Sequence, residues 1–407
     1  MLYILTPSIN LHIQETFDLV FDLERPGSTK AFSLLSIPNE NVINSIFENN
    51  LLTSTAEKLF TTTDEDTIVK INRLAFLTQV CCIHSPALIQ NNFSFVTRFL
   101  HFCHYRSVIE MFRTFLGTEE KSRELQHFLL DEKIVDHVLN MIKDSPDEIS
   151  DDPNDEQSQM ISALFRLIPL IKSSEVLSDV ISTAEAIQIV SKLFSHAPLT
   201  VLNAQWAAIN AIITESNSND AIQLADRFLQ MLDNQDEEAF TPYMESIIQI
   251  IQKLVTFNTE FATRIIEWNI GQKLASIIEK YPKHTLAHLT ITKFATQTIE
   301  VPDFAQAVLP PLYEIAQKGF EPGQPVEFRA FAFNFQKLIK EQNNQELTQF
   351  EKFDSDTIEK INELTEVVNN PYGGSLPQHP SEEDHDFGNL TPDQLMTLLR
   401  FITSSRR

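Results

Sequence analysis

The chain has 407 residues, of which 43% are hydrophobic and 21% are charged, and its formal net charge is −25. This composition supports folding and excludes global disorder. The acidic balance argues against binding to nucleic acid, whose phosphates require clustered Lys and Arg, and against binding to anionic membrane surfaces. We therefore expect the partners to be other proteins, and neither nucleic acid nor membrane.

Glycine is scarce in this sequence. Eight glycines are about 2% of the chain, against roughly 7% in average proteins. Tight β-hairpins and phosphate-binding loops both require glycine. The sequence therefore predicts an all-α fold.

The cysteine count and the N-terminal stretch indicate the compartment. Three cysteines are too few for a disulfide framework, which favours a reducing environment. The stretch MLYILTPSIN has no basic region before a long apolar run, and no run reaches 18 apolar residues. We predict a cytoplasmic protein, with the nucleus as a second location.

The first half of the chain contains an irregular start, two helical units and an acidic insertion. Residues 1–50 are punctuated by Pro and Gly, which suits a terminal capping unit. Helical patterns begin at Thr67 and Arg106. The stretch 143–156 is acidic, contains two prolines and has no apolar periodicity, so we predict a solvated loop. We expect deletion of Asp147–Asp155 to leave the fold intact, because no apolar contact depends on it.

Five helical segments then recur at a nearly constant spacing of 44, 41, 42 and 41 residues. This period is typical of HEAT and armadillo repeats, in which stacked helical hairpins bury one another's apolar faces. The sequence predicts a right-handed armadillo/HEAT-like solenoid over residues 1–369. The five segments begin at Gln157, Val201, Pro242, His284 and Pro325, and the helices that pair with them begin at Glu132, Glu185, Ala221 and Gly271.

The end of the chain differs from the repeats. Residues 370–390 concentrate Gly, Pro and acidic residues, which predicts a disordered linker. Residues 391–407 fit a short amphipathic helix. Two interpretations of this helix stay open: it caps the solenoid, or it is a tethered ligand for a groove on a partner.

Part of the chain resembles a known family. Four pieces carry the resemblance: INRLAFLTQV (71–80), RSVIEMFRTFL (106–116), FLLDEKIVDHVLNMI (128–142) and DEQSQMISALFRLI (155–168). In this order they resemble the SAPS-domain family, the regulatory subunits of type-6 Ser/Thr protein phosphatases. The resemblance covers about 67–213, and the chain departs from the family at Phe128, where Trp is usual.

The resemblance implies a non-catalytic scaffold that binds a Ser/Thr phosphatase catalytic subunit and directs it to substrates. Within the resembling region, some charged residues are not needed for helix packing, and Arg is enriched at interface hot spots. We therefore predict that the phosphatase contacts Arg106, Arg113, Asp131, Glu132 and Lys133.

Other chemistry has weaker support in the sequence. A Cys/His cluster spans residues 81–104, but its spacing lacks CxxC pairs, so we expect core residues and no metal. The acidic loop lacks the glycine that an EF-hand requires. No nucleophile elbow, P-loop or dinucleotide motif is present. We predict no enzyme activity and no cofactor, and we keep a generic armadillo-type adaptor and a cryptic metal hydrolase as alternatives.

Three residues fit short kinase motifs. Ser145 and Thr391 each precede a proline, and Ser381 precedes an acidic run. Such short patterns also arise often by chance. We predict them as phosphorylation sites.

Overall fold

The computed structural model describes residues 12–62, 66–91, 93–233, 238–301 and 303–341. The chain divides into two units, Met1–Gln342 and Asn343–Arg407. The second unit lies outside the described residues. So do the predicted linker (370–390), the predicted C-terminal helix (391–407), Ser381 and Thr391.

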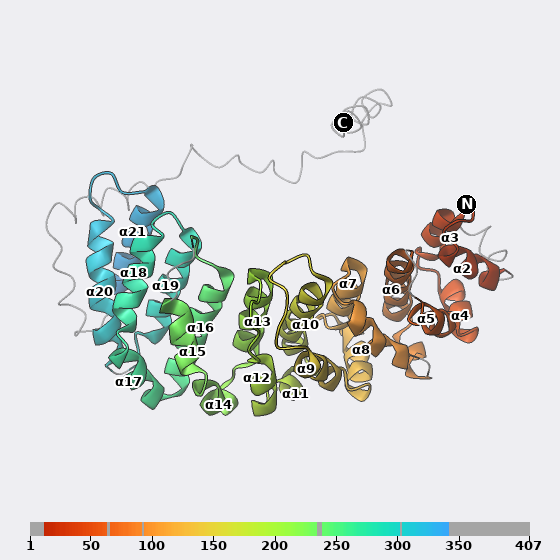
Figure 1. Cartoon of the computed structure of the whole chain (residues 1–407), viewed down its shortest axis with the longest axis horizontal. Coiled ribbons are helices and arrows are strands. Elements are labelled where there is room, and N and C mark those ends of the chain that lie inside the picture. Colours follow the sequence, from red (N-terminus) through yellow and green to blue (C-terminus); the bar gives the residue numbers. More distant parts are fainter. Residues whose placement is uncertain (1–11, 63–65, 92, 234–237, 302, 342–407) are drawn as a thin grey trace, which may run out of the picture. The chain divides into compact units, whose positions relative to one another are not determined.

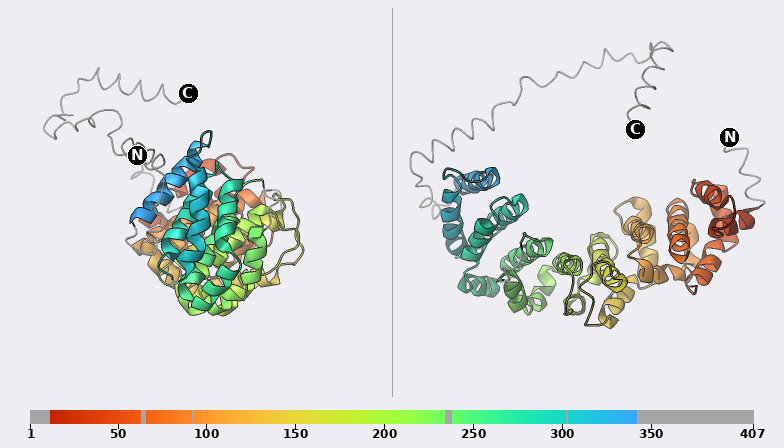
Figure 2. Two further views of the ribbon diagram at one scale, coloured as in Figure 1. Left: turned by 90° about the vertical axis from the view of Figure 1, so that its left-hand side faces the viewer. Right: turned by 45° about the horizontal axis from the view of Figure 1, so that its top comes forward.

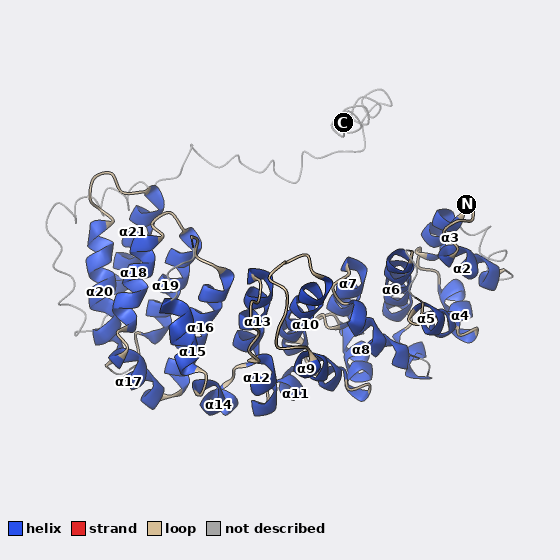
Figure 3. Cartoon of the chain, in the orientation of Figure 1, coloured by secondary structure: helices blue, strands red, loops and turns tan. Residues whose placement is uncertain are grey.

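Every regular element in the described part of the chain is a helix, as Figure 3 shows. Its sole β-type pairing is an isolated bridge between Glu148 and Ser195. The all-α prediction is confirmed. Among the described residues, no helix is long and apolar enough to cross a membrane.

Seven helices form a series in which each packs against the next along the chain (Figure 1). Every one contains a segment that the sequence predicted from its periodicity. We call them the first-row helices, and the right view in Figure 2 shows the helices in chain order by their colours. They are α6 (Thr67–His84), α7 (Arg106–Phe115), α10 (Glu156–Ser173), α13 (Leu199–Ile212), α16 (Pro242–Phe257), α19 (Thr285–Thr298) and α21 (Val326–Glu341).

A second set of helices alternates with the first row along the chain, and we call them the second-row helices. They are α8 (Glu120–Asp131), α9 (Ile134–Asp144), α12 (Ala184–Val190), α15 (Ala225–Asp233), α18 (Ile270–Lys280) and α20 (Phe304–Lys318). The predicted partner helices lie here, with two errors: α9 begins at Ile134 and not at Glu132, and the segment predicted from Ala221 is broken between α14 (Ser218–Ile222) and α15.

Shorter elements complete the described part of the chain. Four helices precede the first row, η1 and η2 lie between α6 and α7, and the others connect the two rows. They are α2 (Ile13–Phe21), α3 (Ser28–Leu35), α4 (Glu40–Glu48), α5 (Leu51–Leu59), η1 (Pro86–Asn91), η2 (Ser94–Phe102), α11 (Ser178–Ile181), η3 (Glu215–Asn217) and α17 (Thr259–Glu267).

The helix α16 shows how the repeat forms locally. Pro242 occupies its first turn, where the missing N–H costs nothing. Its apolar residues, Ile251 among them, are buried at helical spacing. Thr241 lies at the N-cap, but its hydroxyl makes no capping bond. The side-chain oxygen of Asn203, on α13, instead accepts the backbone N–H of Tyr243 at 3.0 Å.

Polar contacts between neighbouring first-row helices join residues that are about one repeat apart. The Asn72 side chain accepts the Ser107 N–H at 3.2 Å, and Asn210 donates to Gln249 at 2.6 Å. These pairs lie 35 and 39 residues apart in sequence. The sequence period thus corresponds to the contacts between successive units, as expected for a helical-repeat stack.

The second-row helices share a further contact that repeats along the stack. A cation in or just after one helix reaches the C-terminal end of the preceding one, where the helix dipole favours positive charge. Lys192 donates to the Lys143 carbonyl at 2.9 Å, and Lys318 pairs with Glu279 at 2.9 Å. Arg227 and Lys273 do the same with Ser191 and Asp233. Burial lowers the pKa of Arg227 to about 10.

Candidate partner-binding site

The two predicted arginines lie on α7. Arg106 is the first residue of this helix and is exposed, and no hydrogen bond or ion pair joins it to another described residue. The Arg113 side chain is 57% exposed and pairs with Glu110 at 2.6 Å. Of these two arginines, Arg106 is the one whose guanidinium pairs with no described residue.

The other three predicted residues form the turn between α8 and α9. Asp131 ends α8 and is exposed, Glu132 follows half-buried, and Lys133 is exposed with φ at 54°. A left-handed residue ends the helix here, and the Lys133 N–H donates to the Leu130 carbonyl at 3.0 Å. This turn is why α9 does not begin at Glu132.

The structure places these five residues in two groups. The helices α7 and α8 pack against each other. Within the described part of the chain, no hydrogen bond or ion pair links the arginines of α7 to the turn after α8. The five predicted residues therefore form two separate charged groups, one on α7 and one in the turn after α8.

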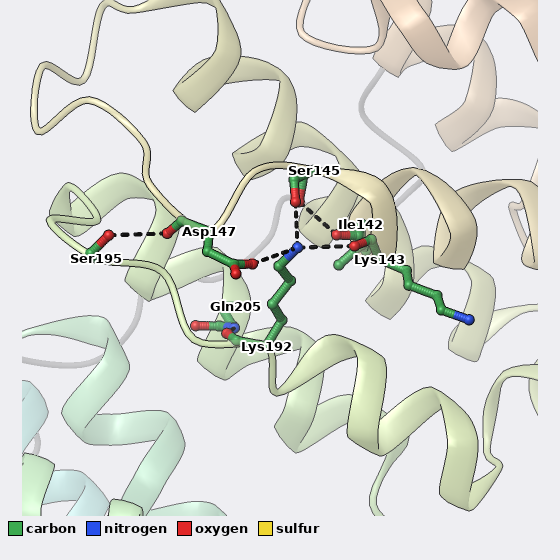
Figure 4. Close-up of polar contacts among 7 residues, drawn as sticks. All are labelled: Ile142, Lys143, Ser145, Asp147, Lys192, Ser195 and Gln205. Atoms are coloured by element: carbon green, nitrogen blue, oxygen red, sulfur yellow. Dashed lines mark hydrogen bonds and ion pairs between the residues drawn. The ribbon is translucent and has the colours of Figure 1, made fainter.

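The acidic loop is attached to the following unit, as Figure 4 shows. The Lys192 ammonium group donates to the Ser145 carbonyl and pairs with the Asp147 carboxylate at 3.0 Å. Ser195 donates its N–H to the Asp147 carbonyl at 2.9 Å. Ser145 itself is half-buried, and its hydroxyl donates to the Ile142 carbonyl at 2.5 Å.

The loop contains one core residue. Ile149 is only 5% exposed, and the Ser158 hydroxyl donates to the Ser150 carbonyl at 3.0 Å. The stretch between α9 and α10 has no helix, as the sequence predicts. The expectation that no apolar contact depends on it is wrong, because a single isoleucine in an acidic run leaves no periodic signal.

A cavity of about 270 Å³ lies among α7, α10, α13 and the acidic loop. His104 is one of the lining residues; its side chain is only 5% exposed, and neither ring nitrogen has a hydrogen-bond partner among the described residues. Its Nε2 atom is 3.8 Å from the Glu156 carboxylate, which is 79% exposed. Burial lowers the pKa of His104, and the nearby Glu156 opposes this shift.

The same cavity is lined by Arg166, an exposed residue of α10. No hydrogen bond or ion pair joins the Arg166 side chain to another described residue. The remaining lining residues contain no Asp or Glu and are Cys103, Ile109, Pro153, Gln159, Ser162, Ala163 and Thr200.

The cysteines of the predicted Cys/His cluster are all buried and free. Burial raises the pKa of Cys81 and Cys103 to about 12, and raises that of Cys82 as well. In the part of the chain that the structure describes, no group of three or more His, Cys, Asp or Glu residues could hold a metal ion. The thiols thus belong to the core.

Charge is unevenly distributed between the rows, a feature that the sequence analysis missed. The whole chain has 31 Lys and Arg against 56 Asp and Glu. The six first-row helices from α6 to α19 have the opposite balance, with eight basic and three acidic residues: Lys70, Arg73, Arg106, Arg113, Arg166, Lys172, Lys253 and Lys293 against Glu110, Glu156 and Glu245. A count of charge per helix would have found this asymmetry.

Comparison with known proteins does not identify a family for this chain. No protein-family model matches the chain, and no curated protein matches it.

Proposed function

We propose that the protein is a non-catalytic scaffold that binds the catalytic subunit of a Ser/Thr protein phosphatase and directs it to substrates. We also propose that its helices form a right-handed stack of the armadillo/HEAT type. Both proposals rest on the resemblance of 67–213 to SAPS-domain regulatory subunits.

One observation carries the functional proposal. The pieces that carry the resemblance fold into α6, α7, the α8–α9 pair and α10, and these elements are consecutive neighbours in the stack. They therefore form one continuous block of the molecule. The block carries exposed charges at Arg106, Asp131 and Lys133 that its core does not need. Stacked repeats of this kind present extended surfaces that suit protein partners.

The buried cysteines support a non-catalytic role. A thiol is a nucleophile as its thiolate, and the raised pKa of Cys81 and Cys103 disfavours that form near neutral pH. A metal hydrolase built on the Cys/His cluster has no support from the positions of these residues.

The runner-up is an armadillo-type adaptor for another protein, in transport or the cytoskeleton. The basic balance of the first-row helices favours it, because this balance suits an acidic partner of any kind. Identification of the proteins that co-purify with the native chain separates the two candidates.

A charge-reversal variant tests the docking block. Reversing Arg106, Arg113, Asp131 and Glu132 together is expected to abolish capture of the phosphatase catalytic subunit, because truncation of interface hot spots costs about 2 kcal/mol or more each. All four are wholly or partly exposed, so the helical circular dichroism spectrum and the melting temperature are expected to stay unchanged.

A matched control reverses the same number of charges of each sign outside the block. The exposed residues for it are Glu260, Glu267, Lys283 and Lys293. We expect this control to bind like the parent. A folded docking-block variant that still captures the phosphatase as the parent does would show that the partner docks elsewhere.

A further inference from the structure

The cavity beside α10 has the chemistry of an anion site. The Arg166 guanidinium pairs with no described residue, whereas the second-row cations Lys192, Lys273 and Lys318 all pair with carboxylates. Neither ring nitrogen of the buried His104 has a hydrogen-bond partner among the described residues, so His104 gains from a ligand that accepts its N–H. A planar guanidinium and an imidazole together suit an oxyanion.

Among the described residues, no Asp or Glu lines this cavity. The acidic loop contributes Pro153 to the wall but none of its carboxylates. Asp155 is used as the N-cap of α10, where its carboxylate accepts the Ser158 N–H at 3.0 Å. The Glu156 carboxylate extends mainly into solvent. The described residues that line the cavity therefore leave it open to an anion from elsewhere.

The size and surroundings of the cavity indicate the source of that anion. A volume of about 270 Å³ is large enough for a single carboxylate side chain. The site opens beside Arg166, on a first-row helix that has no acidic residue after Glu156. Because the first row is basic within an acidic protein, it attracts an acidic segment better than a neutral one.

We propose that this cavity is a seat for one Glu or Asp side chain from an extended acidic segment of a protein partner. Arg166 binds the carboxylate at the rim, and His104 donates a hydrogen bond to it from the buried wall. The inference rests on the proposed function for the identity of the protein that supplies the segment. The chemistry of the seat is independent of that identity.

Fluorescence anisotropy with the full chain tests the seat. The probe is a labelled peptide of alternating Glu and Ala, and its matched control has Gln in place of each Glu. The Glu peptide is expected to bind and the Gln peptide to bind much more weakly, with affinity falling as salt rises. Arg166→Gln is expected to weaken binding by about tenfold or more, because a charge-assisted bond is lost.

Two further variants complete the test. Lys121→Gln removes one exposed charge from α8, away from the cavity lining, and is expected to bind like the parent. His104→Asn is expected to weaken binding if its circular dichroism spectrum matches the parent's. Arg166 is exposed, so Arg166→Gln gives the decisive result even if the His104 variant does not fold.

Three results would overturn the proposal: equal affinity for the Glu and Gln peptides, parental affinity in Arg166→Gln, or binding of inorganic phosphate without binding of the Glu peptide. Capture of a phosphatase is measured separately. Binding of the Glu peptide without that capture supports the seat and contradicts the proposed function, whereas capture without peptide binding does the reverse.

Discussion

Gly271, on α18, packs directly against the backbone of α20. A Cβ atom built at this position would be 2.7 Å from the Ala307 carbonyl oxygen and 2.9 Å from the Cα atom of Val308. Both contacts are with backbone, which cannot rotate away as a side chain does. The scarce glycine of this chain is used here for close helix packing.

Replacement of this glycine by alanine tests the packing. Alanine favours a helix over glycine by about 1 kcal/mol, so propensity alone predicts that Gly271→Ala is more stable. We expect the opposite, a loss of about 1–3 kcal/mol, because α18 and α20 must move apart. Chemical denaturation measures this, with Gln272→Ala on the exposed face of α18 as the control. A Gly271→Ala protein as stable as the parent would contradict the packing.

At the scale of elements, the loop between α9 and α10 behaves as part of the stack. Lys192 and Ser195 hold its first residues against the next unit, and Ile149 enters the core. The polar contacts with Lys192 and Ser195 and the buried Ile149 side chain therefore both hold the loop against the stack.

Truncation of Ile149 measures how much the loop contributes to stability. Ile149→Ala is expected to lower the free energy of unfolding by about 2–5 kcal/mol, the usual cost of emptying a core isoleucine site. Glu148→Ala removes an exposed neighbour and is expected to change it by less than about 0.5 kcal/mol. If both variants unfold at the same denaturant concentration, the loop is dispensable.

The sequence predicts those helices whose pattern of apolar residues lies within one continuous stretch of the chain. The first-row helices were found because each carries an apolar stripe at helical spacing, and the stripes recur at one period. The left-handed turn at Lys133 could not be predicted in the same way, since glycine or asparagine is the usual residue there. The capping of α16 by Asn203 could not be predicted either, because the capping group is on another helix.

The candidate site was predictable only in part, for a related reason. Arg106 and the turn residues were identified from a continuous stretch of sequence. The cavity joins His104, Arg166 and Thr200, which lie on different elements, and only the stacking of α7, α10 and α13 brings them together. A Lys or Arg side chain can bind a partner only if no ion pair within the chain already occupies it. Which ion pairs form depends on the folded structure and cannot be predicted from the sequence alone.

At the scale of the whole described unit, each helix packs mainly against helices near it in the chain. Basic residues outnumber acidic ones in the first-row helices, although the chain as a whole is acidic. Successive first-row helices pack against each other, while the second row uses its cations to join one helix to the next. The stability of such a stack is close to the sum of the stabilities of its units and of the interfaces between neighbouring units. The exposed charges on the first row are therefore available to bind a partner.

The central claim is that this stack captures a Ser/Thr phosphatase catalytic subunit. Size-exclusion chromatography with light scattering, on the purified chain mixed with a purified type-6 catalytic subunit, tests it most directly. The account predicts one complex that is heavier than either protein and is lost when Arg106, Arg113, Asp131 and Glu132 are reversed. Elution of the two proteins as separate species at concentrations well above micromolar would contradict the claim.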